Sequence, residues 1–258
     1  MKKITSRDYS SDYFKLHEVR YLDKDSWSKK RVADIIRMVK PKKDEWILDL
    51  GCGIGVAGLE CARRGSHVLG VDFSADALRI ANKLKKKMGL AEQIDFVCST
   101  VNTLPVKQNN KFRKVMAADL IEHLYPQQFK AMLKECYRVL EPGGELFIYT
   151  PNPEINFLLI RTIGVLERLV KRFSNRPDQN FSETKKSMIK EHNERYEQLL
   201  HVGLKNLQTI VKSLKENGFM LKKKRATRIP FEKILGRVPF ARFRLGGHLC
   251  ISAKKIKS

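Results

Sequence analysis

The segment WILDLGCGIGVAG, residues 46–58, decides the fold of this chain. A short apolar run leads into Asp49, and glycines then stand at every second position: Gly51, Gly53 and Gly55. This pattern predicts a buried strand, a tight glycine turn and the start of a helix. Glycine has no Cβ and tolerates positive φ, so the turn can approach a ligand closely, and the helix behind it offers free N–H groups. A nucleotide-like ligand is expected there.

Strands and helices are expected to alternate from residue 45 to residue 150. The strands are predicted at 47–50, 67–71, 94–97, 115–118 and 145–150, and the helices at 56–64, 75–88 and 126–140. Ser74 is the expected N-cap of the second of these helices. The run Pro142-Gly143-Gly144 is expected to be a turn into the fifth strand. Such alternation is typical of right-handed βαβ units on a parallel sheet.

The chain has 258 residues, of which 42% are hydrophobic, so it can form one domain or one domain with an insertion. Residues 1–43 are predicted to be an N-terminal helical extension with a helix at 27–39, and residues 44–258 the main domain. Within it, 151–203 is predicted to be a substrate-side helical insertion. Its amphipathic helix is expected at 155–173 and a polar loop at 174–187. A helix at 204–216 and strands at 219–224 and 247–253 should follow.

The five cysteines are scattered and form no C-x-x-C pair, which argues against a disulfide framework or zinc knuckle and favours a reduced, cytoplasmic setting. The N-terminus lacks the apolar core of a signal peptide. No apolar run reaches the length of a membrane-spanning helix. The net charge of +23 points to an anionic partner, either nucleic acid, an acidic membrane surface or a phosphorylated substrate. A solvated, lysine-rich surface is the alternative.

Asp72 ends the second predicted strand, a little over 20 residues past the glycine turn. A carboxylate at that place can accept hydrogen bonds from both hydroxyls of a ribose. It can also cap the helix that starts at Ala75. The third glycine of the turn comes one residue earlier than in the G-x-G-x-x-G pattern of dinucleotide-binding proteins.

The ordered motifs resemble those of class I S-adenosylmethionine-dependent methyltransferases. They are ILDLGCGIG (47–55), VLGVDFS (68–74), FVCSTVNTLP (96–105), ADLIEHL (118–124), LEPGGEL (140–146), HV (201–202) and NGF (217–219). The resemblance implies an α/β fold with a doubly wound, seven-stranded, mostly parallel sheet whose last strand is antiparallel. Helices are then expected on both of its faces.

The resemblance also implies which residues hold S-adenosylmethionine. Asp49 and Gly51 would lie by its methionine part, Gly53 and Gly55 would let the loop pass closely, Asp72 would hold the ribose, and Phe73 would line the adenine. The family usually carries Asp, which contacts adenine N6, where this chain has Thr100. The candidates near adenine are therefore Ser99, Thr100 and Val101. A second departure is Phe112-Arg113-Lys114-Val115, where the family commonly has F-D-x-V.

Asp119, Glu122 and His123 would share one side of a helical turn after the fourth strand. They resemble the E-x-x-E-H element of ubiquinone-pathway O-methyltransferases and of small-RNA 2′-O-methyltransferases, in which a later histidine completes a metal site. Here that histidine would be His201, with His192 as a second choice. Mg²⁺ suits this oxygen-rich set better than zinc. Without a metal, His123 and Glu122 are the catalytic candidates and Asp119 a cofactor contact.

Three functions stay open at this point. The first is methyl transfer to a small or lipid-like acceptor, at oxygen by resemblance, with an acidic membrane surface as a partner. The second is methylation of RNA at a 2′-oxygen, which the charge supports. The third is cofactor binding without catalysis, supported only by the departures at Thr100 and Arg113. The basic tail, residues 222–258, with 12 Lys and Arg and one acid, fits the first two.

Overall fold

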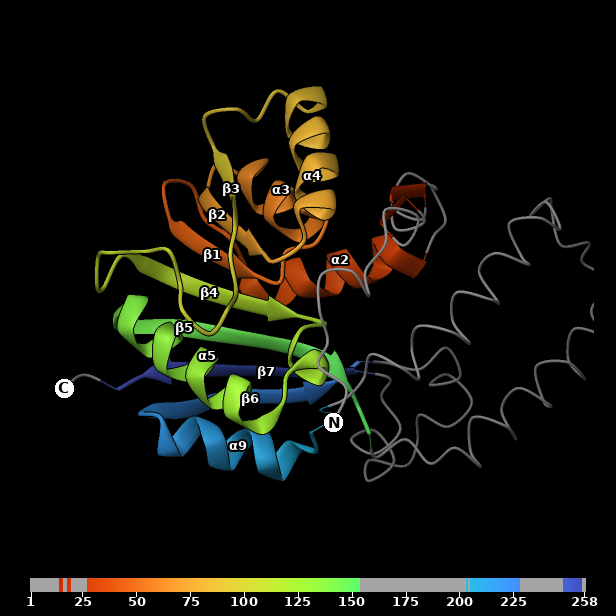
Figure 1. Ribbon diagram of the computed structural model, residues 1–258. Helices are drawn as coiled ribbons and strands as arrows, with labels where there is room; N and C mark the ends of the chain where they lie inside the picture. Colours follow the sequence, from red (N-terminus) through yellow and green to blue (C-terminus); the bar gives the residue numbers. More distant parts are fainter. Residues whose placement is uncertain are drawn as a thin grey trace, which may run out of the picture.

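A computed structural model describes residues 14–15, 18–19, 27–153, 203, 205–227 and 248–256. Its centre is a seven-stranded sheet of order β3-β2-β1-β4-β5-β7-β6 (Figure 1). The strands are β1 (Trp46–Leu50), β2 (His67–Asp72), β3 (Ile94–Cys98), β4 (Phe112–Ala118), β5 (Leu140–Pro151), β6 (Phe219–Ala226) and β7 (His248–Lys255). The helices are α2 (Trp27–Val39), α3 (Val56–Ala62), α4 (Ala75–Lys87), η2 (Ile121–His123), α5 (Pro126–Val139) and α9 (Leu207–Glu216).

The sheet is parallel from β3 to β5, and β7 runs antiparallel between β5 and β6. This confirms the expected doubly wound sheet with its last strand reversed. β1 lies between β2 and β4, so the chain moves out from β1 in both directions. Ligands of such sheets bind at the carboxyl ends of the strands, where the order reverses. The glycine turn follows β1 and therefore lies at that place.

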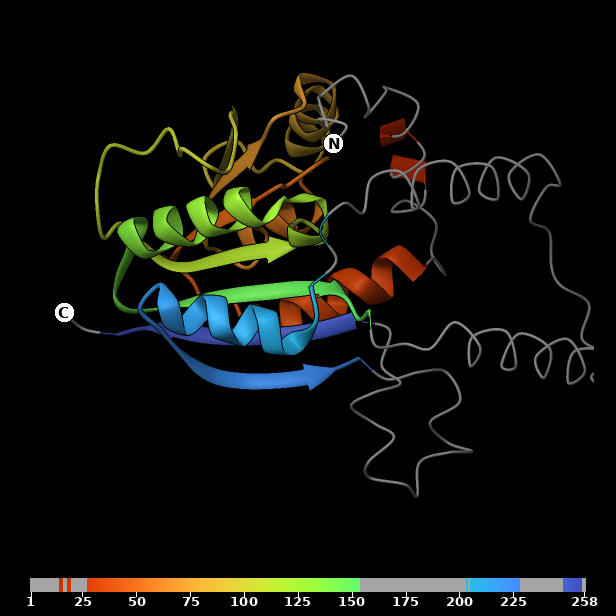
Figure 2. The same cartoon turned by 60° about the horizontal axis from the view of Figure 1, so that its bottom comes forward.

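Helices cover both faces of the sheet (Figures 1 and 2). Side chains of α5 and α9, such as Met132 and Ile210, join one buried apolar cluster. Side chains of α2, α3 and α4 join a second cluster on the other face, with Ile35 and Leu59 among its members. The side chains of a strand alternate between the two clusters because successive residues point to opposite faces. The two layers of helices hold the strand ends, and hence the loops that follow them, in place.

Most predicted elements are confirmed, but several boundaries need correction; β4, for example, begins at Phe112 and not at residue 115. Ser74 caps α4, since its hydroxyl accepts a hydrogen bond from the amide of Ala77 at 3.3 Å. The expected turn at Pro142-Gly143-Gly144 is wrong, because β5 already begins at Leu140 and these residues form an irregularity in its pairing with β4. Gly143 makes this possible with a φ of +77°. α9 begins at Leu207, after the cap Asn206, and not at residue 204.

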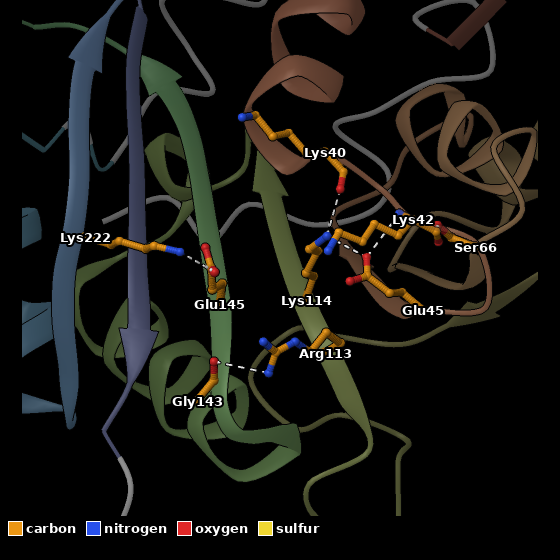
Figure 3. Close-up of polar contacts among 9 residues, drawn as sticks. All are labelled: Lys40, Lys42, Glu45, Ser66, Arg113, Lys114, Gly143, Glu145 and Lys222. Carbon is orange, nitrogen blue, oxygen red and sulfur yellow. Dashed lines mark hydrogen bonds and ion pairs between the residues drawn. The ribbon is translucent and has the colours of Figure 1, made fainter.

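The departure at Arg113 and Lys114 has a structural explanation (Figure 3). Lys114 is buried, and its Nζ donates to the carbonyl of Lys40 at 2.8 Å and to the carboxylate of Glu45 at 2.5 Å. Arg113 donates to the carbonyl of Gly143 at 3.4 Å. Lys114 thereby joins the end of α2 to the start of the sheet, far from the strand ends that form the ligand site.

Several predictions lie outside the described residues. They include the amphipathic helix 155–173, the loop 174–187, His192 and His201. The division into an extension, a main domain and an insertion stays a prediction. In the part of the chain that the structure describes, no helix is long and apolar enough to span a membrane.

Candidate active site

A cavity of about 460 Å³ lies at the carboxyl ends of the central strands. It brings together most of the predicted cofactor contacts, namely Asp49, Gly51, Gly53, Asp72, Phe73, Ser99, Thr100, Val101 and Asp119, and also His123. Phe14, Arg31, Val32 and Ile35 add a wall from the N-terminal extension. Gly55 and Glu122 are not among the lining residues, and His201 lies outside the described residues. The site therefore unites groups from the first and the fourth strand, and from the extension before them.

The three glycines of the turn share a backbone conformation but differ in the space around them. Gly51, Gly53 and Gly55 all have positive φ, at +63°, +54° and +79°. A Cβ on Gly53 would meet no atom within 4 Å, so its backbone faces open space. A Cβ on Gly55 would lie 2.6 Å from the ring of Phe96. Gly55 is thus needed for packing at the start of α3. A Cβ on Gly51 would lie 2.7 Å from Cδ1 of Leu120, so Gly51 is needed for packing as well. Gly51 and Gly53 both line the cavity.

Asp49 is a buried carboxylate in this wall, only 2% exposed. Among the described residues, nothing forms a hydrogen bond with its Oδ2. Burial raises the pKa of Asp49 to about 8, although the amide of Gly58 lowers it, and the charge of Asp72 adds to the rise. A buried carboxylate oxygen without a partner is costly, and a cation in the cavity would remove that cost.

Asp72 stands at the end of β2 with both of its oxygens engaged. Oδ2 accepts a hydrogen bond from the amide of Gly53 at 2.8 Å, and Oδ1 accepts one from the amide of Ser74 at 2.9 Å. Burial raises the pKa of Asp72, while these amides lower it. The amide of Phe73 lowers this pKa too. A carboxylate has about four acceptor positions, so Asp72 still has capacity for a ligand hydroxyl. The carboxylate therefore shapes the glycine turn and also remains able to bind a ligand.

The loop after β3 forms the next part of the wall. Ser99, Thr100, Val101 and Asn102 all line the cavity. Asn102 was not singled out in the sequence, yet its Oδ1 is buried and has no hydrogen-bond partner in the described part of the chain. An amide oxygen in this state is an acceptor for an exocyclic amine. It lies two residues after Thr100, the position at which the expected acidic contact is missing.

Asp119 connects three distant parts of the chain. Its carboxylate lies 2.7 Å from Nη1 of Arg31 in α2, and 3.8 Å from Nε2 of His248 in β7. The backbone of Asp119 has a φ of +49°, a strained conformation for a residue other than glycine. His248 stacks on Tyr149 with ring centroids 4.7 Å apart. Burial lowers the pKa of His248, although Asp119 raises it.

Glu122 and His123 occupy the short helix η2 but face different surroundings. Glu122 is 1% exposed and accepts a hydrogen bond from the hydroxyl of Thr150 at 3.0 Å. Burial raises the pKa of Glu122 to about 8, and the nearby charge of Asp119 adds to this. His123 lines the cavity. Of the two catalytic candidates, only His123 is placed to touch a bound molecule.

The predicted metal ligands are not gathered into one set in the described ranges. Those ranges contain no group of three or more His, Cys, Asp and Glu side chains that could hold a metal ion. Asp119 pairs with Arg31, and Glu122 is turned to Thr150. The fourth predicted ligand, His201, is outside these ranges. The Mg²⁺ site stays a prediction.

A family model described as a methyltransferase domain matches residues 47–144, which hold the glycine turn, Asp72 and Asp119. A ubiquinone biosynthesis O-methyltransferase of Idiomarina loihiensis is 35% identical over 118 residues, 46% of this chain and 47% of that one. A second protein of that name, from Ralstonia nicotianae, is 27% identical over 157 residues, 61% of this chain and 60% of that one. Residues 47–144 are thus similar in sequence to a methyltransferase domain.

Solved structures share the fold of this methyltransferase domain. A S-adenosylmethionine-dependent methyltransferase of Methanosarcina mazei has a TM-score of 0.59 at 19% identity, over 87% of this chain and 98% of that one. A geranyl diphosphate C-methyltransferase of Streptomyces coelicolor has a TM-score of 0.60 at 14% identity, over 96% and 85%. The chain spans from about half to three fifths of the length of the two curated relatives above. At these identities the likeness to the solved structures shows a shared fold.

Proposed function

We propose that this chain transfers a methyl group from S-adenosylmethionine to an oxygen atom of a small, largely apolar acceptor. The observation that carries the proposal is the buried oxygen of Asp49, which has no described partner and lies in the cavity behind the glycine turn. The cofactor carries a sulfonium and an ammonium group, and either cation would stabilise the ionised form of Asp49.

The remaining contacts fit the same molecule. Asp72 and Phe73 line the cavity. Asp72 is proposed to accept a hydrogen bond from the ribose, and Phe73 is proposed to pack on the adenine. The oxygen of Asn102 can accept from the exocyclic amine of the adenine, which supplies a polar contact in the absence of Asp at Thr100. Because these contacts can hold the adenine, the presence of Thr100 in place of the usual Asp gives little support to the alternative that the protein binds the cofactor without catalysis. Arg113 donates to the carbonyl of Gly143 and does not line the cavity, so this departure gives no support to a protein without catalysis.

The bound cofactor supplies an electrophilic methyl group. Methyl transfer then needs alignment of the acceptor, exclusion of water and removal of one proton. The acceptor oxygen forms the new O–C bond, the S–C bond breaks, and its electron pair stays on sulfur. His123 lines the cavity and is the proposed base that takes the hydroxyl proton. Glu122 is buried and accepts a hydrogen bond from Thr150, and it is proposed to orient the turn that carries His123.

The acceptor side of the cavity is largely apolar. Phe14, Val32 and Ile35 belong to its wall, and each of these side chains is at most 7% exposed. An apolar wall beside the imidazole of His123 favours a small molecule with an apolar body and a reactive hydroxyl. The curated relatives are named for O-methylation in ubiquinone biosynthesis, which supports oxygen as the acceptor atom. RNA methylation is not favoured by any described contact.

An anionic membrane surface remains a prediction from the charge. On β6, Lys222, Lys223, Lys224 and Arg225 are all exposed, and polybasic segments favour anionic lipid. Sedimentation with anionic liposomes, compared with RNA gel shifts over a salt series, tests this prediction. A saturable shift that depends on RNA sequence or on RNA ends would instead favour nucleic acid.

The decisive experiment uses the full chain and methyl-labelled S-adenosylmethionine. Calorimetry should show saturable cofactor binding, and an extract of small molecules and lipids should yield a labelled, base-stable product. A H123Q variant should bind the cofactor as the wild type does but lose transfer by about a hundredfold or more. Labelled RNA, or binding without any labelled product, would contradict the proposal.

A further inference from the structure

We propose that Lys205 is a positioning residue for His123, and that it acts by holding the carbonyl groups of the turn on which His123 sits. This inference rests on the proposed function of His123 as the base. Neither the family model nor the sequence pattern assigns a role to Lys205, which follows the insertion and precedes the cap of α9.

The side chain of Lys205 is buried and surrounded by backbone oxygens. It is 7% exposed, and its Nζ donates to the carbonyls of Ile121, Leu124 and Gly203 at 2.7, 2.8 and 2.6 Å. Ile121 and Leu124 flank the two residues Glu122 and His123. The ammonium group therefore bridges both ends of the catalytic turn and uses all three of its protons.

The backbone beside Lys205 closes on the same turn. The amide of Gly203 donates to the carbonyl of Glu122 at 2.8 Å. A Cβ on Gly203 would lie 2.0 Å from the carbonyl oxygen of Leu124, so no larger residue fits without movement of the turn. Gly203 and Lys205 thus both form hydrogen bonds with the turn, and neither of them lines the cavity, whereas His123 does.

Burial of the Lys205 ammonium group costs free energy, and this cost needs an explanation. Burial lowers the pKa of Lys205 to about 8, although the charge of Glu122 raises it. The Nζ also lies 5.0 Å from the centre of the Phe129 ring, which adds a cation–π contact. A turn as short as η2 has few hydrogen bonds of its own, since only residues 121–123 are helical. The bonds from Lys205 to the carbonyls of Ile121 and Leu124 therefore add to the two backbone hydrogen bonds of the turn, His123 to Leu120 and Leu124 to Ile121.

Lys255 provides a matched control. It is 6% exposed, donates to the carbonyl of Leu140 at 2.7 Å and to Oδ1 of Asn110 at 2.8 Å, and lies 4.5 Å from the ring centre of Tyr137. Its surroundings resemble those of Lys205, but its partners lie at the start of β5 and just before β4, and not at the catalytic turn. K205M and K255M should lower the melting temperature to a similar degree, because both leave buried acceptors without a donor.

The experiment compares K205M, the milder K205Q and K255M in the full chain. The expected result is a fall in kcat of about tenfold to a hundredfold in K205M, with the calorimetric Kd for the cofactor within about twofold of wild type. K255M should keep kcat. Equal kcat losses in K205M and K255M, or full activity in K205M, would overturn the inference.

A second measurement does not depend on the acceptor. In NMR spectra of the histidine rings, the signal of His123 can be assigned by its absence in H123Q. It should shift in K205M and K205Q but stay in place in K255M. An unmoved His123 signal in folded K205M overturns the inference. If the wild type binds the cofactor but transfers no methyl group, the proposed function fails, and the ring signal still decides whether Lys205 positions His123.

Discussion

Nη1 of Arg31 lies 2.7 Å from Oδ2 of Asp119, so the N-terminal helix α2 is bound directly to the loop after β4 at the edge of the cavity. The two side chains are only 26% and 21% exposed. Their pairing makes α2 part of the site, and it neutralises one of the three carboxylates that line the cavity, Asp49, Asp72 and Asp119.

Replacement of Arg31 by Gln should lower kcat/KM for the acceptor by about tenfold, because Asp119 loses its partner and the wall formed by α2 moves. R37Q is the matched control on the same helix. Arg37 also pairs with an acid, Asp34, but its side chain is 63% exposed and does not line the described cavity. Steady-state kinetics of both variants measure the effect. Equal losses would show that the ion pair at the cavity has no special importance.

Replacement of Asp72 by Ala should weaken cofactor binding by tenfold to a hundredfold or more, since hydrogen bonds to charged groups contribute about 1.5–3 kcal/mol each. Isothermal calorimetry of the full chain measures it. D95N removes an acid from the neighbouring strand β3, where Asp95 is 79% exposed, and should bind normally. Unchanged affinity in D72A would remove Asp72 from the ribose site.

Cofactor binding should release protons near pH 7 and strengthen as the pH rises toward 8. Asp49 has a pKa of about 8 without ligand, so it is mostly protonated at pH 7. A bound cation favours the charged carboxylate and lowers that pKa, so binding is tighter above it. Calorimetry in buffers of different ionisation enthalpy counts the protons. D49N should release fewer protons, and equal release in both proteins would contradict this account.

Replacement of Asn102 by Ala should raise the cofactor Kd by about fivefold to tenfold, because the exocyclic amine loses one acceptor. The same substitution should hardly change the affinity for a cofactor analogue whose purine lacks this amine. N82A is a suitable control, since Asn82 only donates to the carbonyl of Leu78 within α4. Similar losses for both ligands would place Asn102 away from the adenine.

Methyl transfer should persist after chelation of divalent ions, within about twofold. The reason is that Arg31 already neutralises Asp119 and Thr150 holds Glu122, so neither carboxylate is directed to a shared ion. The measurement is the initial rate with EDTA, and with Mg²⁺ added back. Loss of activity that Mg²⁺ restores in the wild type but not in H201A would instead support the predicted site of Asp119, Glu122, His123 and His201.

The elements around the glycine turn could be predicted because their signals are local. A strand followed by Gly51, Gly53 and Gly55 specifies a turn whatever surrounds it, and Ser74 caps α4 through a contact three residues away. The reversal of β7 followed from the family resemblance. The start of β5 was missed because Pro142 and two glycines are typical of a turn, while the pairing of Leu140 with Phe112 is a long-range contact.

The sequence alone determined the fold class, the glycine turn after β1 and the carboxylates at the ends of β1 and β2. Tertiary structure decided which of the candidates reach the cavity. It placed His123 in the wall and Glu122 beneath it, made Gly55 a packing residue, and brought Arg31 and Lys205 to the site from distant segments. In a chain with 51 lysines and arginines, no local pattern marks these two. Their roles arise from contacts across about 80 or more residues of chain, which periodicity and spacing do not encode.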